Sequence, residues 1–423
     1  MSDFTARTVV VMGQGYVGVP LAVRAAEAGH HVVGFEPDPR RLGMLAEGRS
    51  YVEDIPAARL RSALASGHYR PTCEADDLAC YDVAVIAVPT PLRDRVPDLS
   101  AVEDAAATLS PYLRPGATVV LESTTYPGTT DEIVGPVLEG GSGLCPGADF
   151  HLGYSSERID PGNGRWTLDN TPKLVSGVDE TSLKAIAEFY ATFVDQVVPV
   201  SRPCVAELAK LIENTFRHVN IALVNELAMF ASELDIDIGE AIDAAATKPF
   251  GFMRFDPGPG VGGHCLPIDP TYLSWRVRNT LNRSFRFVEL ANDINDHMPE
   301  YVTRRLAEAL NRRRRAVNGA RILLLGLAYK KNSGDCRESP ALEIAARLTA
   351  AGAEVRAADP HVVEELSLPG VTRVTATEAE VAAADVVMLV TDHDSFDREM
   401  VRSRARFVFD TRRQIHGPNV EAL

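Results

Sequence analysis

The chain has 423 residues, of which 45% are hydrophobic and 24% are charged. This is an ordinary composition for a globular protein of two or three domains. Aspartate and glutamate total 58 against 43 lysine and arginine residues, giving a formal net charge of -15. The acidic balance argues against broad electrostatic attraction to nucleic acid or to an anionic membrane. We assign the one basic run, Arg312 to Arg315, to a solvated helix end.

Six cysteines are scattered along the chain and lack the paired short spacings of a zinc site. A chain of this length needs no disulfides, so we expect reduced thiols, no metal centre and a cytoplasmic location. The N-terminal segment runs directly into a strand-like run without a signal sequence, and no stretch approaches about 18 uninterrupted apolar residues. We therefore expect neither export nor a membrane-spanning segment.

Residues 8–13 form an apolar, β-branched run, followed by a glycine-rich turn, a helical stretch to about Ala28 and a strand-like run at 31–36. Further strand-like runs lie between segments of helical periodicity, at 82–88, 118–122 and 173–176. Repeated βαβ units with right-handed crossovers predict a doubly wound, largely parallel sheet. We expect residues 1–200 to form this Rossmann domain.

The middle of the chain has a different pattern. Residues 204–234 contain no glycine or proline and predict one long helix that is apolar on more than one face. A stretch rich in glycine and proline follows at 249–270, and a further amphipathic helix is expected from about 287 to 313. We expect residues 201–315 to form a central helical domain whose apolar surface makes the protein a homodimer or a larger homo-oligomer.

The α/β alternation restarts at Arg321 and predicts a second, smaller domain over residues 316–423. Its first strand leads into GLAYKKNSGD instead of a second glycine-rich GxGxxG turn. The expected fold class is therefore α/β, with two Rossmann-like, doubly wound parallel-sheet domains joined by a long central helix.

Gly13, Gly15 and Gly18 form a GxGxxG turn directly between a strand and a helix, and Glu36 ends the next strand. The glycines permit a tight turn and close approach of a pyrophosphate to the helix N-terminus. Glu36 would accept hydrogen bonds from a ribose and repel a 2′-phosphate, which favours NAD over NADP. Arg40 and Arg41 lie close by in the sequence and keep a phosphate-bearing cofactor open.

The loop PGPGVGGHCLPIDP at 257–270 places Cys265 two residues after a glycine pair and four before Asp269. A thiol with free access can attack an aldehyde to give a thiohemiacetal, from which a second hydride can leave. A buried, inert cysteine is the alternative interpretation of this loop.

Several motifs, in the same order, resemble the UDP-glucose/GDP-mannose dehydrogenase family over essentially the whole chain. They are VVVMGQGYVGVPLA, VPTP at 88–91, ESTTYPGTT at 122–130, SSERIDPG at 155–162, AELAKLIENTFRHVN at 206–220, the cysteine loop, and GLAYKKNSGDCRESPA at 326–341.

The resemblance implies six catalytic residues. Cys265 matches the family's nucleophile, and Asp269 matches an aspartate that helps to activate water. Lys210 and Asn214, four residues apart on one helix, match a pair that stabilises oxyanions. The other two matches are a glutamate that positions water or acts as a base, and a threonine near the reacting centre; they are Glu157 and Thr124.

The resemblance also implies NAD as cofactor and a nucleotide-diphosphate sugar as substrate. The expected cofactor-binding residues are Gly13, Gly15, Tyr16, Val17, Gly18, Glu36, Arg41, Pro89, Thr90, Thr124 and Lys330. The expected substrate-binding residues are Glu157, Arg158, Lys210, Asn214, Gly262, Lys330 and Arg337, with Asp335 and Arg412 near the nucleotide. The implied reaction oxidises the sugar 6-hydroxymethyl group to a carboxylate through a Cys265 thioester and produces two NADH.

The chain departs from UDP-glucose dehydrogenases at two places. Ile268 stands where they carry a lysine, and they tend to have an arginine in the preceding segment, where this chain reads TKPFGFMRF. These departures resemble the branch that acts on UDP-N-acetylglucosamine or UDP-N-acetylmannosamine, while UDP-glucose and dTDP-glucose remain open. Two alternatives also remain: a two-electron hydroxyacid or phosphogluconate dehydrogenase, and a non-catalytic nucleotide-sugar-binding protein.

Overall fold

The structure is a computed structural model. It describes residues 5–93, 96–159, 165–263, 266–363 and 366–423. The chain forms two compact units, Met1–Glu213 with Trp275–Asn282, and Asn214–Ser274 with Arg283–Leu423. The division falls inside one long helix, α7 (Pro203–Glu233). The three domains expected from the sequence, with boundaries near residues 200 and 315, stay a prediction.

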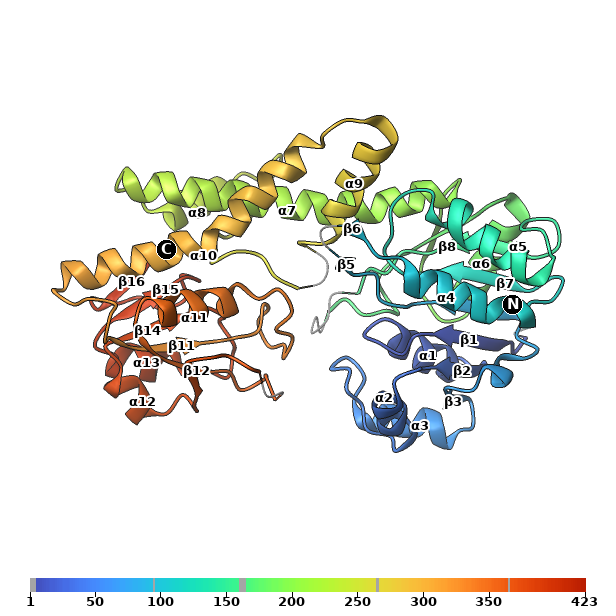
Figure 1. Ribbon diagram of the computed structural model, residues 1–423, viewed down its shortest axis with the longest axis horizontal. Helices are drawn as coiled ribbons and strands as arrows, with labels where there is room; N and C mark the ends of the chain where they lie inside the picture. The colour runs from blue at the N-terminus through green and yellow to red at the C-terminus, as the bar shows by residue number, and fades with distance from the viewer. Residues whose placement is uncertain (1–4, 94–95, 160–164, 264–265, 364–365) are drawn as a thin grey trace. The chain divides into compact units, whose positions relative to one another are not determined.

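The first unit contains an eight-stranded sheet in the order β10-β9-β8-β7-β4-β1-β2-β3. Figure 1 labels β1, β2, β3, β7 and β8 of this sheet. Its strands are β1 (Thr8–Met12), β2 (His31–Phe35), β3 (Tyr69–Thr72), β4 (Val83–Ile86), β7 (Thr118–Leu121), β8 (His151–Tyr154), β9 (Lys173–Gly177) and β10 (Val197–Pro199). A two-stranded ribbon, β5 (Leu92–Arg93) and β6 (Val96–Pro97), stands apart from it. Strands β3-β2-β1-β4-β7-β8 are parallel and have the strand order of a Rossmann fold, which confirms the predicted architecture.

Strand β9 departs from the parallel pattern, because it pairs antiparallel with β8. No helix is described between Tyr154 and Lys173, and a parallel return would require a crossover connection, usually a helix. The helices of this unit are α1 (Gly18–Glu27), α2 (Pro39–Ala46), α3 (Ala57–Ala65), α4 (Ser100–Leu109), α5 (Gly135–Ser142) and α6 (Glu180–Tyr190).

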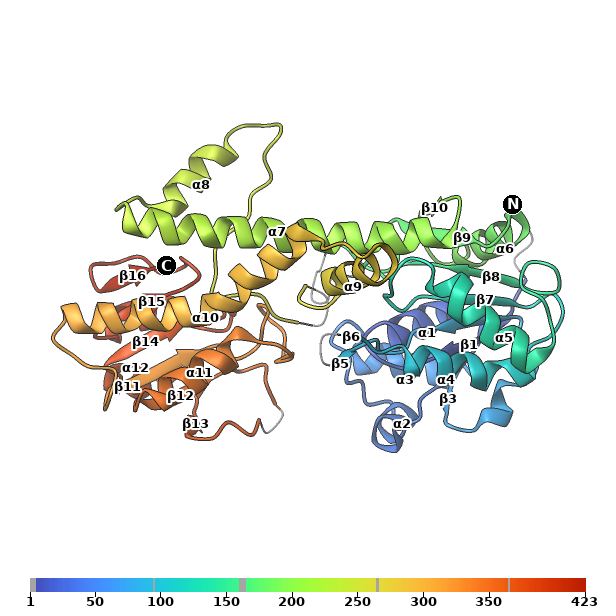
Figure 2. The same cartoon turned by 45° about the horizontal axis from the view of Figure 1, so that its top comes forward.

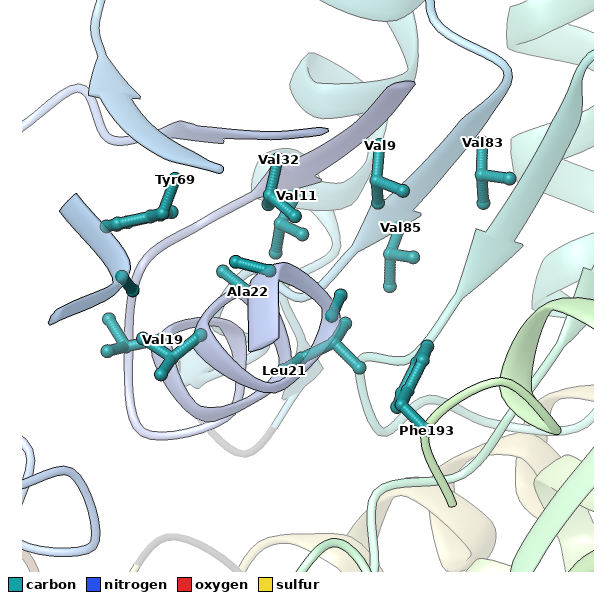
Figure 3. Close-up of a cluster of buried hydrophobic side chains, with 14 of the residues drawn as sticks. Val9, Val11, Val19, Leu21, Ala22, Val32, Tyr69, Val83, Val85 and Phe193 are labelled. Carbon is teal, nitrogen blue, oxygen red and sulfur yellow. The ribbon is translucent and has the colours of Figure 1, made fainter. Parts of the chain in front are cut away.

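The core of the first unit lies between the central strands and α1 (Figure 3). Val9 and Val11 of β1 alternate onto the face that packs against Leu21 and Ala22, and all four are essentially buried. β-Branched side chains at alternate strand positions suit this packing. This core fixes the glycine-rich turn, because the turn directly joins β1 to α1.

The middle of the chain contains α7, α8 (Ile238–Ala246), α9 (Asp269–Leu281) and α10 (Arg286–Arg312). The two long helices predicted from the sequence are therefore confirmed, with bounds that differ by one residue from the expected ones. Helices α8 and α9 were not predicted. Among the described residues, none of these helices combines the length and hydropathy needed to cross a bilayer.

The second unit contains a six-stranded, wholly parallel sheet in the order β13-β12-β11-β14-β15-β16 (Figure 2). Its strands are β11 (Arg321–Leu325), β12 (Glu354–Ala358), β13 (Val371–Arg373), β14 (Val386–Leu389), β15 (Val408–Asp410) and β16 (Val420–Ala422), and its helices are α11 (Pro340–Ala350), α12 (Glu378–Ala383) and α13 (Arg398–Arg404). Ile322 and Leu324 pack into the core formed with α10 and α11, whereas Leu323 and Leu325 face α12 and α13. This order confirms the second Rossmann-like domain.

Candidate active site

Each glycine of the first turn has its own steric requirement. Gly13 has φ +87°, and a Cβ atom there would lie 2.7 Å from the carbonyl oxygen of Ala87. A Cβ atom at Gly18 would lie 1.8 Å from the carbonyl oxygen of Gly13. Nothing lies within 4 Å of the corresponding position at Gly15. The first and last glycines are therefore needed for the turn itself, while Gly15 leaves open space for a ligand, next to the start of α1 after Val17.

Glu36 follows β2 at the expected position, and only 5% of it is exposed. Its Oε2 accepts a hydrogen bond from the Gln14 amide (3.2 Å), and its Oε1 accepts one from the Asp38 amide (3.0 Å). An ionised carboxylate has about four acceptor positions, so capacity remains for ribose hydroxyls. Arg40 forms an ion pair with Asp38 at 3.0 Å, and its hydrogen bond lowers the pKa of that aspartate.

Sequence reasoning missed the residues that fix this turn from outside. The Tyr51 hydroxyl donates to the Gln14 carbonyl oxygen (2.5 Å), and the Tyr69 hydroxyl donates to Gln14 Oε1 (2.9 Å). Arg41 lies over the ring of Tyr51, 5.7 Å from its centroid. Burial raises the pKa of both tyrosines, so both remain donors at neutral pH. Nothing in their local sequence marks them, because they come from separate segments.

The loops after β4 and β7 meet at the same edge of the sheet. The Thr90 hydroxyl donates to the Thr124 carbonyl oxygen at 2.8 Å, so the structure brings these two predicted residues together. Pro89, beside Thr90, is exposed, and so is Tyr16 in the glycine-rich turn. Thr125 was not singled out, yet its hydroxyl is buried with no hydrogen-bond partner among the described residues. Such a group is a candidate for contact with a ligand or water.

Glu207 of α7 fixes the segment that follows these threonines. Its carboxylate accepts hydrogen bonds from the Gly128 amide (2.6 Å), the Thr130 amide (2.9 Å) and the Thr130 hydroxyl (2.7 Å). Burial raises the pKa of Glu207, and these hydrogen bonds oppose that effect. Arg276 of α9 pairs with Glu132 in the same segment at 2.6 Å. The threonine loop is therefore held by α7 only three residues before Lys210.

Lys210 and Asn214 both lie on α7, as predicted. Lys210 is 7% exposed and has no hydrogen-bond or ion-pair partner in the part of the chain that the structure describes. Asn214 donates a short hydrogen bond to Oδ2 of Asp269, the first residue of α9. Asp269 is 3% exposed. Lys210 belongs to the first unit, and Asn214 and Asp269 belong to the second. Cys265 lies outside the described residues.

Glu157 lies after β8 at the edge where the parallel strands end, and it is 9% exposed. Its neighbour Arg158 forms an ion pair with Glu213 of α7 at 2.7 Å and donates to the Pro172 carbonyl oxygen at 2.7 Å. The Arg158 side chain is thus committed to contacts within the protein. Its role at a substrate site stays a prediction.

The glycine loop before Cys265 packs against the loop that follows β11. A Cβ atom at Gly262 would lie 2.6 Å from the carbonyl oxygen of Glu338, and the Gly263 amide donates to the Arg337 carbonyl oxygen at 2.9 Å. The Arg337 guanidinium pairs with Asp335 at 2.6 Å. Lys330 is partly buried in the same loop. The second unit therefore places three predicted substrate-binding residues on two adjoining loops.

Two buried residues, Asp359 and His393, hold the loop after β11 through hydrogen bonds to its backbone amides. Oδ2 of Asp359 accepts hydrogen bonds from the Leu327 amide (2.7 Å), the Ala328 amide (2.9 Å) and His393 Nε2 (3.0 Å). His393 Nδ1 accepts from the Asn332 amide at 2.8 Å, which makes Nε2 the protonated nitrogen. Sequence reasoning did not identify this pair.

A cavity of about 460 Å³ lies in the second unit. Three arginines, Arg254, Arg412 and Arg413, line it together with His416 and several acidic residues. Arg412 donates from Nε to the Val390 carbonyl oxygen at 2.7 Å, and burial lowers the pKa of its guanidinium. Arg412, expected near the nucleotide, lines this cavity, and its role at a substrate site stays a prediction.

Three parts of the sequence match the UDP-glucose/GDP-mannose dehydrogenase family. Residues 7–194 match its NAD binding domain, 204–297 its central domain and 323–417 its UDP binding domain. These matches confirm the family expected from the motifs, the NAD cofactor and a nucleotide sugar as the class of substrate. The turn at Gly13 to Gly18 and the carboxylate of Glu36 suit such a cofactor.

Similar proteins extend over the whole chain. UDP-N-acetyl-D-mannosamine dehydrogenase of Pyrococcus horikoshii is 35% identical over 97% of this chain and 97% of its own length. UDP-N-acetyl-D-glucosamine 6-dehydrogenase of Pseudomonas aeruginosa is 36% identical over 92% of this chain and 91% of its own. The solved structure of the P. horikoshii UDP-D-ManNAc dehydrogenase aligns over 98% of both chains with a TM-score of 0.88 and 33% identity. The chain therefore belongs to the UDP-glucose/GDP-mannose dehydrogenase family and is an NAD-dependent nucleotide-sugar dehydrogenase.

Proposed function

We propose that the protein oxidises the 6-hydroxymethyl group of a UDP-linked N-acetylhexosamine to a carboxylate, a four-electron oxidation that passes through a thioester on Cys265. The observation that carries this proposal is the arrangement on α7. The side chain of Lys210, 7% exposed, lies one helical turn before an amide, Asn214, that is hydrogen-bonded to the carboxylate of Asp269. Because Lys210 has no counter-ion among the described residues, its ammonium is available to stabilise an anionic oxygen of the substrate.

The chemistry assigned to these groups follows from their charges. Bound NAD would accept a hydride in each of the two oxidation steps. Lys210 and Asn214 stabilise the negative oxygen that develops at carbon six, and Asp269 or a water that it holds removes the hydroxyl proton. Cys265 adds to the resulting aldehyde as a thiohemiacetal, and loss of the second hydride leaves the thioester. Water then releases the uronate with Glu157 as base.

The sugar is proposed from two features. The relatives named above act, by their names, on UDP-N-acetylmannosamine and UDP-N-acetylglucosamine. Ile268, in the cysteine loop, is 8% exposed and apolar where UDP-glucose dehydrogenases carry a lysine. An apolar side chain in this loop suits an acetamido group better than an added positive charge does. UDP-glucose and dTDP-glucose are the competing substrates.

The test measures NADH formation with UDP-N-acetylglucosamine, UDP-N-acetylmannosamine, UDP-glucose, dTDP-glucose and GDP-mannose side by side. We expect one N-acetylhexosamine substrate to give the highest kcat/KM and about two NADH per sugar, because the oxidation removes four electrons. Cys265→Ala should abolish steady-state uronate formation. One NADH per sugar, or full turnover by Cys265→Ala, would refute the four-electron mechanism.

We also propose that the protein is a cytoplasmic homodimer. Large apolar side chains on α7, each between 37% and 55% exposed, follow helical spacing; they are Leu208, Ile212, Phe216, Leu223, Leu227 and Phe230. A continuous apolar stripe of this length is typical of an interface. The five described cysteines are free, as a reducing compartment favours.

Light scattering at micromolar concentration should give twice the chain mass. Leu223→Glu with Leu227→Glu should shift the protein towards monomer, because it places charges in the stripe. Val363→Glu is the matched control, since Val363 is 94% exposed and lies outside the stripe. A monomeric wild-type protein would contradict the dimer.

A further inference from the structure

Because β9 runs antiparallel to β8, it places a lysine at the edge of the first sheet where the parallel strands end. Gly153 pairs with Gly177 and Tyr154 with Ser176 in the antiparallel ladder of β8 and β9. Lys173, the first residue of β9, therefore lies beyond the end of β8, beside Glu157. A parallel β9 would have placed Lys173 at the opposite edge of the sheet. Ligands of doubly wound sheets bind at the edge where the parallel strands end.

The Lys173 ammonium lies between two carboxylates. Its Nζ is 2.5 Å from Glu122 Oε1 and 3.9 Å from Glu157 Oε2. Glu122 directly follows β7, and the Tyr190 hydroxyl donates to the same Glu122 oxygen at 2.7 Å. The side chains of Lys173 and Glu122 are 3% and 0% exposed. These contacts join the ends of β7 and β8 through a group that no solvent reaches.

The two carboxylates have different positions relative to Lys173. Glu122 is the close counter-ion, and burial raises its pKa while the Lys173 charge opposes that shift. A buried ammonium requires one such close partner. Glu157 lies farther from Lys173, so the ion pair with Glu122 leaves the Glu157 carboxylate available for another partner.

The two oxygens of Glu157 also differ from each other. Oε1 accepts a hydrogen bond from the Ile159 amide. Oε2 is buried and has no hydrogen bond among the described residues, although it faces Lys173. Glu157 and Lys173 line a cavity of about 10 Å³, which is close to the smallest space that holds one water molecule. A water there would have an acceptor on one side and a cation near it.

We infer that Lys173, anchored by Glu122, is a positioning residue that holds Oε2 of Glu157 ready to accept a proton from the hydrolytic water. This inference rests on the proposed function, in which Glu157 serves thioester hydrolysis. In that step the water oxygen bonds to the thioester carbonyl carbon, and one water proton passes to Oε2. Collapse of the tetrahedral species breaks the C–S bond, and the Cys265 thiolate leaves.

If Lys173 positions Glu157, variants of either residue should be defective in thioester hydrolysis and not in hydride transfer. With the preferred substrate in rapid-mixing experiments, Glu157→Gln should still release about two NADH per active site in the first turnover and then slow about 100-fold in the steady state. Lys173→Met should show the same pattern with a steady-state loss of about tenfold, because the base remains but is less well placed. Lys173→Arg should recover most of that loss.

Combining the two changes tests whether they act through one group. The double variant Glu157→Gln with Lys173→Met should have the same steady-state rate as Glu157→Gln alone. Without the Glu157 carboxylate, loss of the lysine that positions it has no further effect. Lys184→Met removes an exposed lysine of α6 and should leave all rates unchanged. If Lys173→Met does not fold, Glu122→Gln, which keeps the shape of the anchor, should give the same hydrolysis-specific loss.

The possible outcomes distinguish a failure of the positioning role of Lys173 from a failure of the proposed four-electron oxidation. A wild-type first turnover that releases one NADH would refute the four-electron function. Normal steady-state turnover by Glu157→Gln would refute the role of Glu157 and the inference with it. A slow Glu157→Gln enzyme beside a fully active Lys173→Met enzyme would overturn the inference alone, as would loss of the first-turnover NADH in Lys173→Met.

Discussion

Six parallel strands of the first sheet, β3-β2-β1-β4-β7-β8, have the same order as the six strands of the second sheet, but the loops that follow the first strand differ. Gly13 follows β1 with φ +87°, and its amide donates to the Phe35 carbonyl oxygen at 3.0 Å. Gly326 follows β11 with φ +91°, and its amide donates to the Ala358 carbonyl oxygen at 2.9 Å. Up to this residue the two turns are built alike.

The next strand ends in an acidic residue in both units, but the two carboxylates differ in their hydrogen bonds. Glu36 accepts one amide hydrogen from the first turn, that of Gln14. Asp359 accepts two from the second turn and a further hydrogen from His393. In the second unit the protein's own carboxylate thus satisfies the amides that an anionic ligand would contact. Strand order therefore sets where a ligand can bind, and the chemistry of the turn determines whether a dinucleotide does.

The largest effect should come from removing the second carboxylate. Asp359→Ala leaves two buried amides and the His393 ring without their shared acceptor, so we expect a loss of about 3–5 kcal/mol in unfolding free energy. Denaturant unfolding followed by circular dichroism measures it. Glu36→Ala is the matched change in the first turn and should cost much less; equal losses would contradict the contrast between the two turns.

The next effect tests the glycines of the first turn. Gly18→Ala places a methyl group 1.8 Å from the Gly13 carbonyl oxygen, so the turn must open. We expect NAD affinity to fall about 100-fold, because the helix N-terminus is displaced from the pyrophosphate. Calorimetric titration with NAD measures this. Gly15→Ala meets no atom within 4 Å in the folded chain, so a change in its thermal stability would argue against the described turn.

Acid should distinguish two buried groups, one in each unit, by the pH at which each stops contributing to stability. Burial lowers the pKa of His30, in the first unit, from 6.5 to about 4. The unfolded chain therefore takes up this proton first, and stability of order 2 kcal/mol is lost between about pH 6.5 and 4.

Asp359 responds in a lower range. Burial raises its pKa, but hydrogen bonds from His393, Ala328 and Leu327 outweigh burial and lower it overall. Its contribution is therefore complete above about pH 4 and is lost as the pH falls further. The unfolding free energy should depend less steeply on pH above pH 4 in His30→Gln, and less steeply below pH 4 in Asp359→Asn, than in the wild-type protein. The reverse assignment would refute both causes.

The smallest effect concerns the first carboxylate. Glu36→Gln should weaken NAD binding about tenfold and reduce the preference for NAD over NADP, because the charge that repels a 2′-phosphate is gone. KM values for the two cofactors measure both changes. An unchanged cofactor ratio would show that Glu36 does not face the ribose.

Much of the fold follows from local sequence patterns. Helix α7 was predicted because about thirty residues run without glycine or proline and carry apolar side chains on more than one helical face, which is too long a run for a strand. The parallel strands were predicted because apolar runs alternate with helical segments. The direction of β9 was not predicted, since an apolar run has the same period in either direction. Helix α9 was missed because it begins within a segment rich in glycine and proline.

The site divides in the same way. Gly13, Gly18 and Glu36 are recognisable because their spacing follows from the turn that they make. Lys173, Glu122 and Glu207 have ordinary local surroundings, and their importance comes from partners 16 to 79 residues away. Only tertiary structure brings such groups together, so no pattern within one segment could reveal them.

The long helix α7 limits how this enzyme can be divided or recombined. The boundary between the compact units falls between Glu213 and Asn214, so a cut there separates Lys210 from Asn214. A fragment ending before α7 keeps the glycine-rich turn but lacks both groups. A chimaera that takes either Rossmann-like domain without the whole of α7 would therefore gain a ligand-binding fold but lack Lys210, Asn214 or both.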